Sequence, residues 1–249
     1  MKEGNSEKAA RLVAQSRRAV ALTGAGISTP SGIRDFRSPG TGHWSQVDPI
    51  EVASIHSFLR HPERFYAWFA DSWQEMAAAE PNPAHLALAE LEKRGILRAV
   101  VTQNIDGLHQ KAGSREVLEL HGNARMAACL RCGAQQSTED ALVSFRRTGK
   151  VPRCGCGGLI KPTVVLFGEP LPADVLHRAQ REVAQSDLLL VIGSSLAVTP
   201  AADLPWLAVR TGTPIVVCNR DETWVDRFAQ AVVREDVAQS VPALLRGIA

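Results

Sequence analysis

Apolar and polar positions alternate along the chain in blocks that predict helices and strands in turn. Residues 6–17 have the spacing of an amphipathic helix, and the apolar run at 19–24 after it predicts a buried strand. A second amphipathic helix is predicted at 83–95, where Gly95 would end it. Further strands are predicted from the apolar runs at 97–104, 116–122, 187–196 and 213–220. Continuous apolar runs that alternate with helices are typical of an α/β fold whose parallel sheet is covered by helices on both faces.

The segments that follow the predicted strands are short and polar. They read GAGIS at 24–28, TQNID at 102–106, HG at 121–122, GSS at 193–195 and NR at 219–220. In an open parallel sheet, ligands bind beyond the carboxyl ends of the strands. We therefore expect these five segments to line one cleft.

Two segments interrupt the alternation. Residues 36–80 begin as a loop rich in arginine and glycine and continue as an aromatic helix pair. Residues 123–161 contain four of the five cysteines. We interpret both segments as insertions that form a second, smaller lobe.

Composition narrows the class of protein. A chain of 249 residues with 45% hydrophobic content suits one α/β domain with an inserted lobe. The formal net charge of +2 indicates no strong attraction to nucleic acid. No apolar run reaches the roughly 18 residues of a membrane span, and the polar first residues do not resemble a secretory signal. We therefore expect a cytoplasmic protein.

Four cysteines form two closely spaced pairs. Cys129 and Cys132 are separated by two residues, and Cys154 and Cys156 by a single glycine. This pattern is typical of a zinc ribbon, although reduced thiols without a metal are the alternative. Four protein ligands would leave no open coordination position, so such a zinc would be structural. Cys218, in an apolar run, is expected to be a small buried side chain.

The glycine-rich loop departs from the usual dinucleotide pattern. After Gly24 and Gly26, a G-x-G-x-x-G loop requires a third glycine at position 29, where this chain has Thr29. A hydride-transferring dehydrogenase is the main rival for this fold. The missing glycine argues against that rival.

His121 ends a predicted strand at the edge where the cleft should lie. Imidazole can accept a proton near neutral pH, so His121 is either a general base or a structural histidine. Gln103, Asn104 and Asp106 in TQNID could orient a substrate, or they could form a turn that caps the next helix.

These stretches match a known family in the family's own order. The sequence resembles the sirtuins, the NAD-dependent protein deacylases, in their short bacterial and archaeal form. The matching stretches are GAGISTPSGIRDFR (24–37), TQNIDGLH (102–109), HG, the cysteine pairs, KPTVVLFGE (161–169), GSSLAVTPAADLP (193–205) and NR. The resemblance implies a Rossmann-type NAD-binding domain and a smaller lobe made of a zinc ribbon and a helical module. The expected boundaries are 1–35, 81–122 and 162–249 for the NAD-binding domain, 36–80 for the cofactor loop and helical module, and 123–161 for the zinc ribbon.

The resemblance also implies site residues, motif by motif. His121 and Asn104 would be catalytic, and structural zinc would be held by Cys129, Cys132, Cys154 and Cys156. The acyl-lysine peptide would add a strand along Val165, Phe167 and Gly168. A late segment at Asp236 is a looser match to the adenine contacts. NAD would be bound by Gly24, Ala25, Gly26, Ile33, Asp35, Phe36, Arg37, Gln103, Asn104, Ile105, Asp106, Gly193, Ser194, Ser195, Asn219 and Val237.

The implied reaction consumes NAD without hydride transfer. The acyl-lysine carbonyl oxygen would attack the ribose carbon that bears nicotinamide, nicotinamide would leave, and a covalent alkylamidate would form. His121 would then act as base on the ribose hydroxyls, giving free lysine and 2′-O-acetyl-ADP-ribose from an acetylated protein or peptide. A protein mono-ADP-ribosyltransferase that uses the same cleft is the alternative, and an NAD-sensing module without catalysis is a third hypothesis. No membrane or specific nucleic acid is expected as a partner.

The chain departs from the family at a few positions. Arg34 stands where the family usually has proline, and the second cysteine pair is one residue tighter than the common C-x-x-C. Family members that remove succinyl groups have a Tyr and an Arg three residues apart; here Tyr66 is present but Phe69 replaces the Arg. The aromatic residues of this segment are otherwise expected to form the core of the helical module. We expect neutral acyl groups, acetyl first.

Overall fold

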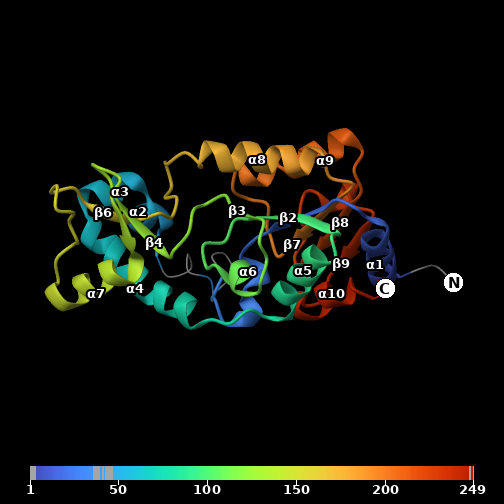
Figure 1. The fold of residues 1–249 in the computed structure, drawn as a ribbon, viewed down its shortest axis with the longest axis horizontal. Helices are drawn as coiled ribbons and strands as arrows, with labels where there is room; N and C mark the ends of the chain where they lie inside the picture. The colour runs from blue at the N-terminus through green and yellow to red at the C-terminus, as the bar shows by residue number, and fades with distance from the viewer. Residues whose placement is uncertain (1–3, 36–39, 41, 43–46, 247, 249) are drawn as a thin grey trace.

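The computed structural model of the chain describes residues 4–35, 40, 42, 47–246 and 248 (Figure 1). Its larger lobe is built on a parallel sheet in the order β3-β2-β1-β7-β8-β9. The strands are β1 (Ala19–Thr23), β2 (Leu97–Thr102), β3 (Val117–Glu119), β7 (Leu188–Ile192), β8 (Ile215–Cys218) and β9 (Ala231–Val233). The parallel sheet predicted from the apolar runs is confirmed. Because β1 lies between β2 and β7, strand order reverses at this point, where open α/β sheets bind ligands.

Helices cover both faces of this sheet (Figure 1). One face packs against α1 (Asn5–Gln15), α5 (Pro83–Lys93) and α10 (Val237–Ala243), and the other packs against α8 (Ala173–Ala184) and α9 (Pro205–Thr211). Within β1, Ala19 and Ala21 belong to the first core, whereas Val20 and Leu22 belong to the second. This alternation follows from the two-residue period of a strand, and burial on both faces explains the unbroken apolar run.

The predicted helix at 83–95 is present as α5. Asn82 caps its start by accepting a hydrogen bond from the Ala84 amide at 2.9 Å, and Pro83 occupies the first turn. Gly95 follows the helix with a φ of 73°, a left-handed conformation that favours glycine.

The smaller lobe lies at one end of the molecule (Figure 1). It contains α2 (Pro49–Ala53), α3 (Ile55–Arg60), α4 (Pro62–Ala78) and α7 (Thr138–Thr148), with an antiparallel sheet of β4 (Met126–Cys129), β5 (Gln135–Ser137) and β6 (Ile160–Pro162). Phe58, Phe65 and Phe69 from the helices share one core with Leu142 and Ile160 from the cysteine-containing segment. The two insertions therefore form one lobe, as predicted.

Some elements differ from the expectation. The strand expected at 116–122 ends at Glu119, so His121 lies in a turn beyond β3 rather than in the strand. Strand β9 was not predicted, because its apolar run is only three residues long, whereas β3 was predicted from the longer stretch 116–122. The domain boundaries remain predictions. No helix within the described residues is long and apolar enough to cross a membrane.

Candidate active site

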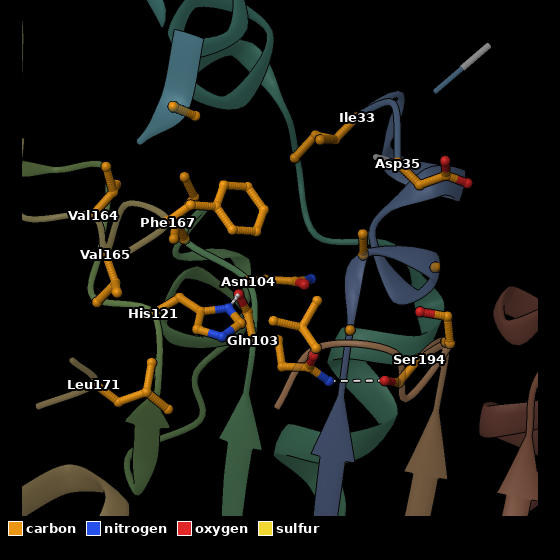
Figure 2. A pocket seen from close by; sticks show the side chains of 18 of the residues that line it. Ile33, Asp35, Gln103, Asn104, His121, Val164, Val165, Phe167, Leu171 and Ser194 are labelled. Atoms are coloured by element: carbon orange, nitrogen blue, oxygen red, sulfur yellow. Dashed lines mark hydrogen bonds between the residues drawn. The ribbon is translucent and has the colours of Figure 1, made fainter. Parts of the chain in front are cut away.

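A cavity of about 910 Å³ lies beyond the carboxyl ends of the central strands and receives side chains from both lobes (Figure 2). One side, which we call the glycine wall, consists of residues 24–35 and 193–195. The other side, which we call the valine wall, consists of residues 164–168. Ile33 and Asp35 lie across the cavity from Val164, Val165 and Phe167 (Figure 2).

Most of the predicted site residues line this cavity. They are Gly24, Ala25, Gly26, Ile33, Asp35, Gln103, Asn104, Ile105, His121, Val165, Phe167, Gly168, Gly193, Ser194, Ser195, Asn219, Asp236 and Val237. Asp106 is not one of the described residues that line it. Phe36 and Arg37 lie outside the described residues.

The glycines of the glycine wall are required because two backbones meet there. The Gly26 amide donates to the Gly193 carbonyl oxygen at 2.8 Å, and the Gly24 amide donates to the Ile192 carbonyl oxygen at 3.2 Å. A Cβ on Gly26 would lie 2.8 Å from that Gly193 oxygen, closer than packed atoms allow. Gly193 has a φ of 58°, and its own Cβ would overlap the Ile27 amide nitrogen. Glycine is therefore needed here for contact between the loops that follow β1 and β7.

Thr29, at the position of the missing third glycine, has a structural explanation. After Gly24 the chain makes two short 3₁₀ turns, Ala25–Ile27 and Thr29–Ser31, instead of entering a long helix. The Thr29 hydroxyl donates to the Gly26 carbonyl oxygen at 3.1 Å and closes the first turn. Among the described residues no long helix begins in this loop, so the third glycine, which in a dehydrogenase allows that helix to pack closely, has no role here.

His121 is oriented by one backbone contact. Its Nδ1 lies 2.9 Å from the Gln103 carbonyl oxygen. A carbonyl oxygen only accepts hydrogen bonds, so Nδ1 must carry the proton. In the neutral ring, Nε2 then holds the lone pair, which is the form that a general base needs.

Asn104 and Asp106 meet at a buried serine. Ser28, only 1% exposed, donates to Asp106 Oδ2 at 2.7 Å and accepts from Asn104 Nδ2 at 3.0 Å. Asp106 also accepts from the Leu108 amide at 2.9 Å, which begins the short helix α6 (Leu108–Lys111). Asp106 therefore acts through Ser28 on the orientation of the Asn104 amide, and it forms the helix-capping turn as well.

Two buried histidines pack behind this serine. His85 Nε2 lies 3.5 Å from the Ser28 hydroxyl, His109 Nε2 lies 3.0 Å from the Thr23 hydroxyl, and the two rings are 4.9 Å apart. Burial lowers the pKa of His85 to about 4, although the Asp106 carboxylate opposes this. Burial, followed by repulsion from His85, lowers the pKa of His109 to about 3. Both rings are therefore neutral near pH 7.

Ser194 and Asn219 mark the far end of the cavity. Gln103 Nε2 donates to the Ser194 hydroxyl at 2.8 Å and joins the loops after β2 and β7 (Figure 2). Asn219, at the end of β8, donates from Nδ2 to the Asp221 carbonyl oxygen at 2.8 Å. Hydroxyl and amide groups at strand ends are suited to bind phosphate and sugar oxygens.

The valine wall connects His121 with the smaller lobe. The Val165 amide donates to the His121 carbonyl oxygen at 2.8 Å, and the Phe167 amide donates to the Ala53 carbonyl oxygen at 2.9 Å. Ile55 returns a bond from its amide to the Phe167 carbonyl oxygen at 3.0 Å. An irregular segment held in this way presents backbone groups along its length, so it can pair with an extended peptide.

A buried lysine holds this segment in shape. Lys161 Nζ donates to the carbonyl oxygens of Pro162 at 3.1 Å and Val164 at 2.7 Å, and it pairs with Glu169 at 3.0 Å. The same Glu169 carboxylate accepts from the Leu166 amide at 2.8 Å. The side chains of Lys161 and Glu169 are 8% and 22% exposed. This pair therefore fastens both ends of the valine wall to each other.

The four paired cysteines meet in the smaller lobe. Their sulfur atoms all lie within 4.8 Å of one another. Cys129 to Cys156 and Cys132 to Cys156 are each 3.5 Å apart, and Cys132 to Cys154 is 3.7 Å. Four sulfurs about 2.3 Å from one tetrahedral zinc would be about 3.8 Å apart, so the cluster fits zinc. Four cysteine ligands would leave no open coordination position, so a zinc held here would be structural.

Sequence comparison identifies the family. Residues 24–200 match the model of the Sir2 family, and this range includes the glycine wall, His121, the cysteines and the valine wall. The chain belongs to the Sir2 family.

Sir2 relatives match almost the full length of the chain. An NAD-dependent protein deacetylase from Sulfolobus acidocaldarius is 44% identical over 98% of this chain and 95% of its own length. An NAD-dependent protein deacetylase 2 from Caldanaerobacter subterraneus is 48% identical over 94% of this chain and 92% of its own. An NAD-dependent protein deacylase 2 from Archaeoglobus fulgidus is 44% identical over 99% and 97%.

Solved Sir2 structures have the same fold. A Sir2 complex with p53 peptide and NAD⁺ has a TM-score of 0.88 and 43% identity, covering 98% of both chains. A Sir2 variant with a deacetylated p53 peptide and 3′-O-acetyl ADP-ribose has a TM-score of 0.91 and 43% identity, covering 96% of both chains. The larger lobe of this chain is therefore a Rossmann-type domain, and the smaller lobe contains the zinc ribbon and helical module.

The aromatic residues of this Sir2 protein divide into two groups. Tyr66 is buried and donates to the Ile160 carbonyl oxygen at 2.9 Å, so it belongs to the core. Phe65, Trp68 and Phe69 are part of the same core but also line the cavity. The position of the family's acyl-binding Arg is therefore occupied by an aromatic ring.

Several lining residues were not singled out from the sequence. Ala53, Leu171, Leu176 and Val198 are apolar and carry no chemical signal, and Asp221 and Glu235 lie outside the stretches that match the family. Arg34 departs from the family pattern, and the structure gives it a partner: its guanidinium lies 2.6 Å from a Glu75 carboxylate oxygen on α4.

Proposed function

We propose that this chain is an NAD-dependent protein-lysine deacetylase that transfers the acetyl group of acetyl-lysine to ADP-ribose. One water molecule is consumed, and the products are nicotinamide, free lysine and 2′-O-acetyl-ADP-ribose. Relatives that match this chain over nearly their whole length are named NAD-dependent protein deacetylases. NAD is the co-substrate, and structural zinc belongs to the smaller lobe.

One observation carries the proposal: His121 lies between the glycine wall and the valine wall with its Nδ1 proton held by Gln103. When NAD is bound, it supplies an electrophilic ribose carbon and the hydroxyls that receive the acetyl group. His121 accepts a proton at Nε2 from such a hydroxyl. Asn104, oriented by Ser28, presents its amide to the cavity floor.

The glycine wall is proposed to bind NAD. Gly24, Ala25 and Gly26 with Gly193, Ser194 and Ser195 would receive the phosphates, while Ile33, Asp35, Gln103 and Ile105 would surround the nicotinamide end. Asn219 and Val237 would contact the adenosine. Asp106 would act indirectly, through its hydrogen bond with Ser28. The NAD contacts of Phe36 and Arg37 stay predictions. In support of this proposal, all of these residues that the structure describes line one cavity, with the exception of Asp106.

The valine wall is proposed to bind the acyl-lysine peptide through Val165, Phe167 and Gly168. The neighbouring Phe65, Trp68 and Phe69 are apolar and offer no cation for an acidic acyl group. Since a carboxylate without a cationic partner loses solvation on entry, acetyl should be preferred to succinyl.

The experiment measures turnover of matched acetyl-lysine and succinyl-lysine peptides with NAD, following nicotinamide and acyl-ADP-ribose by mass spectrometry. We expect acetyl-ADP-ribose from the wild type and a loss of about 10²–10⁴-fold in His121→Ala. His61→Ala, at an exposed position, is the matched control. Peptide that gains ADP-ribose and keeps its acetyl group would instead indicate the mono-ADP-ribosyltransferase, and near-normal turnover by His121→Ala would exclude the assigned base.

A cytoplasmic location is also our proposal. Its support is the four-cysteine cluster, since a zinc ribbon requires reduced thiolates and the cytosol keeps thiols reduced. Fractionation of the source cells with an antibody to the protein tests it.

A further inference from the structure

Arg34 and Glu75 form a two-point ion pair between the two lobes. Arg34 donates from Nη2 to Glu75 Oε1 at 2.6 Å and from Nε to Glu75 Oε2 at 3.3 Å. Two parallel contacts between a guanidinium and a carboxylate fix relative orientation as well as distance. The side chains are 39% and 33% exposed, so water screens the pair only in part.

Arg34 lies on the side of the cavity that is proposed to bind NAD. Ile33, Arg34 and Asp35 all line the cavity and lie outside any helix or strand. Ile33 and Asp35 lie across the cavity from the valine wall (Figure 2). Glu75 belongs to the second half of α4, a 17-residue helix whose buried residues pack in the core of the smaller lobe. The ion pair therefore fastens an irregular end of the glycine wall to a rigid helix.

We propose that the Arg34–Glu75 pair positions the end of the glycine wall and thereby sets the affinity for NAD, with little effect on the affinity for the acyl-lysine peptide. A wall that is already fastened loses less conformational entropy when its ligand binds, and affinity rises by that difference. The inference rests on the proposed function, which identifies the ligand of this wall as NAD. It gives Arg34 a role that proline at this position could not perform, because proline has no charge to pair with Glu75.

The test is a charge-exchange cycle. Arg34→Glu and Glu75→Arg each bring like charges together, whereas the double variant restores an opposite pair in reverse order. We expect each single variant to raise KM for NAD about three- to tenfold, with KM for the peptide changed less than about twofold. The double variant should recover most of the loss. The KM of Arg34→Lys for NAD should lie between the values of the wild type and Arg34→Glu, because an ammonium cannot make the two-point contact.

Two controls separate positioning from general damage. Glu63→Arg reverses a charge at an exposed position in the first turn of the same helix, and it should leave KM for NAD unchanged. Thermal unfolding of each variant shows whether it is folded. Raising the salt concentration should weaken the pair and reduce the difference between wild type and Arg34→Glu.

The outcomes are distinct from those of the functional test. NAD binding is also measured directly by calorimetry, which needs no turnover, so a failed deacetylase assay leaves this measurement intact. If the single variants bind NAD as the wild type does, bind it more tightly, or shift KM for the peptide equally, the inference is overturned. The inference is also overturned if the double variant binds NAD no more tightly than the single variant with the lower affinity for NAD.

Discussion

The two walls of the cavity are built by different physical means. The glycine wall is backbone packed on backbone, where Gly24 and Gly26 contact Gly193 and any added carbon atom overlaps a neighbour. The valine wall is an irregular segment whose shape depends on the side-chain charges of Lys161 and Glu169. Around Gly193 the glycine wall should therefore be sensitive to atoms that are added, whereas the valine wall should be sensitive to charges that are removed.

Removing the metal should produce the largest difference between the walls. The valine wall is bonded to the smaller lobe, whose core includes Cys129, whereas the glycine wall packs on the central strands. Structural zinc contributes about 10–16 kcal/mol in small zinc domains, so a strong chelator should unfold the smaller lobe and abolish peptide turnover. Circular dichroism should retain the signal of the larger lobe. Metal analysis that finds well under one zinc per chain in active protein would contradict this expectation.

The second largest effect should come from adding one methyl group to the glycine wall. Gly193 has a φ of 58°, and Gly193→Ala places a Cβ against the Ile27 amide. We expect the free energy of unfolding to fall by at least about 3 kcal/mol and NAD binding to be lost. Gly212→Ala is the matched control, since its φ of 70° carries similar strain but its Cβ would have no atom within 4 Å. Urea unfolding of both variants isolates the cost of the contact. Equal losses in the two would show that only the backbone angle matters.

Removing one charge should break the valine wall. Lys161→Met leaves the Glu169 carboxylate and two carbonyl oxygens without their buried cation, at a cost of about 2–4 kcal/mol. KM for the peptide should rise more than KM for NAD. The double variant Lys161→Met with Glu169→Gln removes the unpaired charge and should regain part of the stability. A larger effect on NAD than on peptide would contradict the division into two walls.

Mild acid should weaken the glycine wall through His85 and His109. Their pKa values in the folded protein, about 4 and about 3, lie below the ordinary 6.5, so the unfolded chain binds protons first as pH falls. Stability is therefore complete above about pH 6.5 and is lost below it, by up to about 1.4 kcal/mol per pH unit for each ring. Urea unfolding at pH 7.5 and 5.5 measures the loss.

His109→Gln separates this effect from protonation of the cysteine cluster. It removes one buried ring and should reduce the loss between the two pH values, whereas His61→Gln, at an exposed position, should not. An unchanged loss in His109→Gln would mean that other groups cause the sensitivity to acid.

The sequence predicted the elements that burial makes obvious. Unbroken apolar runs gave β1, β2, β7 and β8, because strands covered on both faces contain few polar residues. Strand β9 was missed because polar residues directly flank its three apolar positions, whereas the apolar pattern around β3 extends to Leu120. The position of His121 at the sheet edge was predicted correctly, although it lies in the turn after β3.

The parts that could not be predicted depend on contacts between distant residues. Nothing near Arg34 in the sequence indicates Glu75, and both are polar residues that a solvated surface would equally explain. Binding of NAD by Asp106 stays a prediction, and its contact with Ser28 becomes visible only when the loops after β1 and β2 lie together. Lys161 belongs to a family motif, yet its bonds to the Pro162 and Val164 carbonyl oxygens appear only in the folded segment.

The shared core of the smaller lobe has a consequence for synthesis on the ribosome. The aromatic face of α4 packs against Leu142 and Ile160, which are translated long after α4 itself. At a translation rate of about 5–20 residues per second, the packing partners of Phe65 and Phe69 leave the ribosome exit tunnel several seconds after these two residues do. During that interval they form an apolar surface on a nascent chain, so the growing chain offers a chaperone-binding segment that the finished protein no longer exposes.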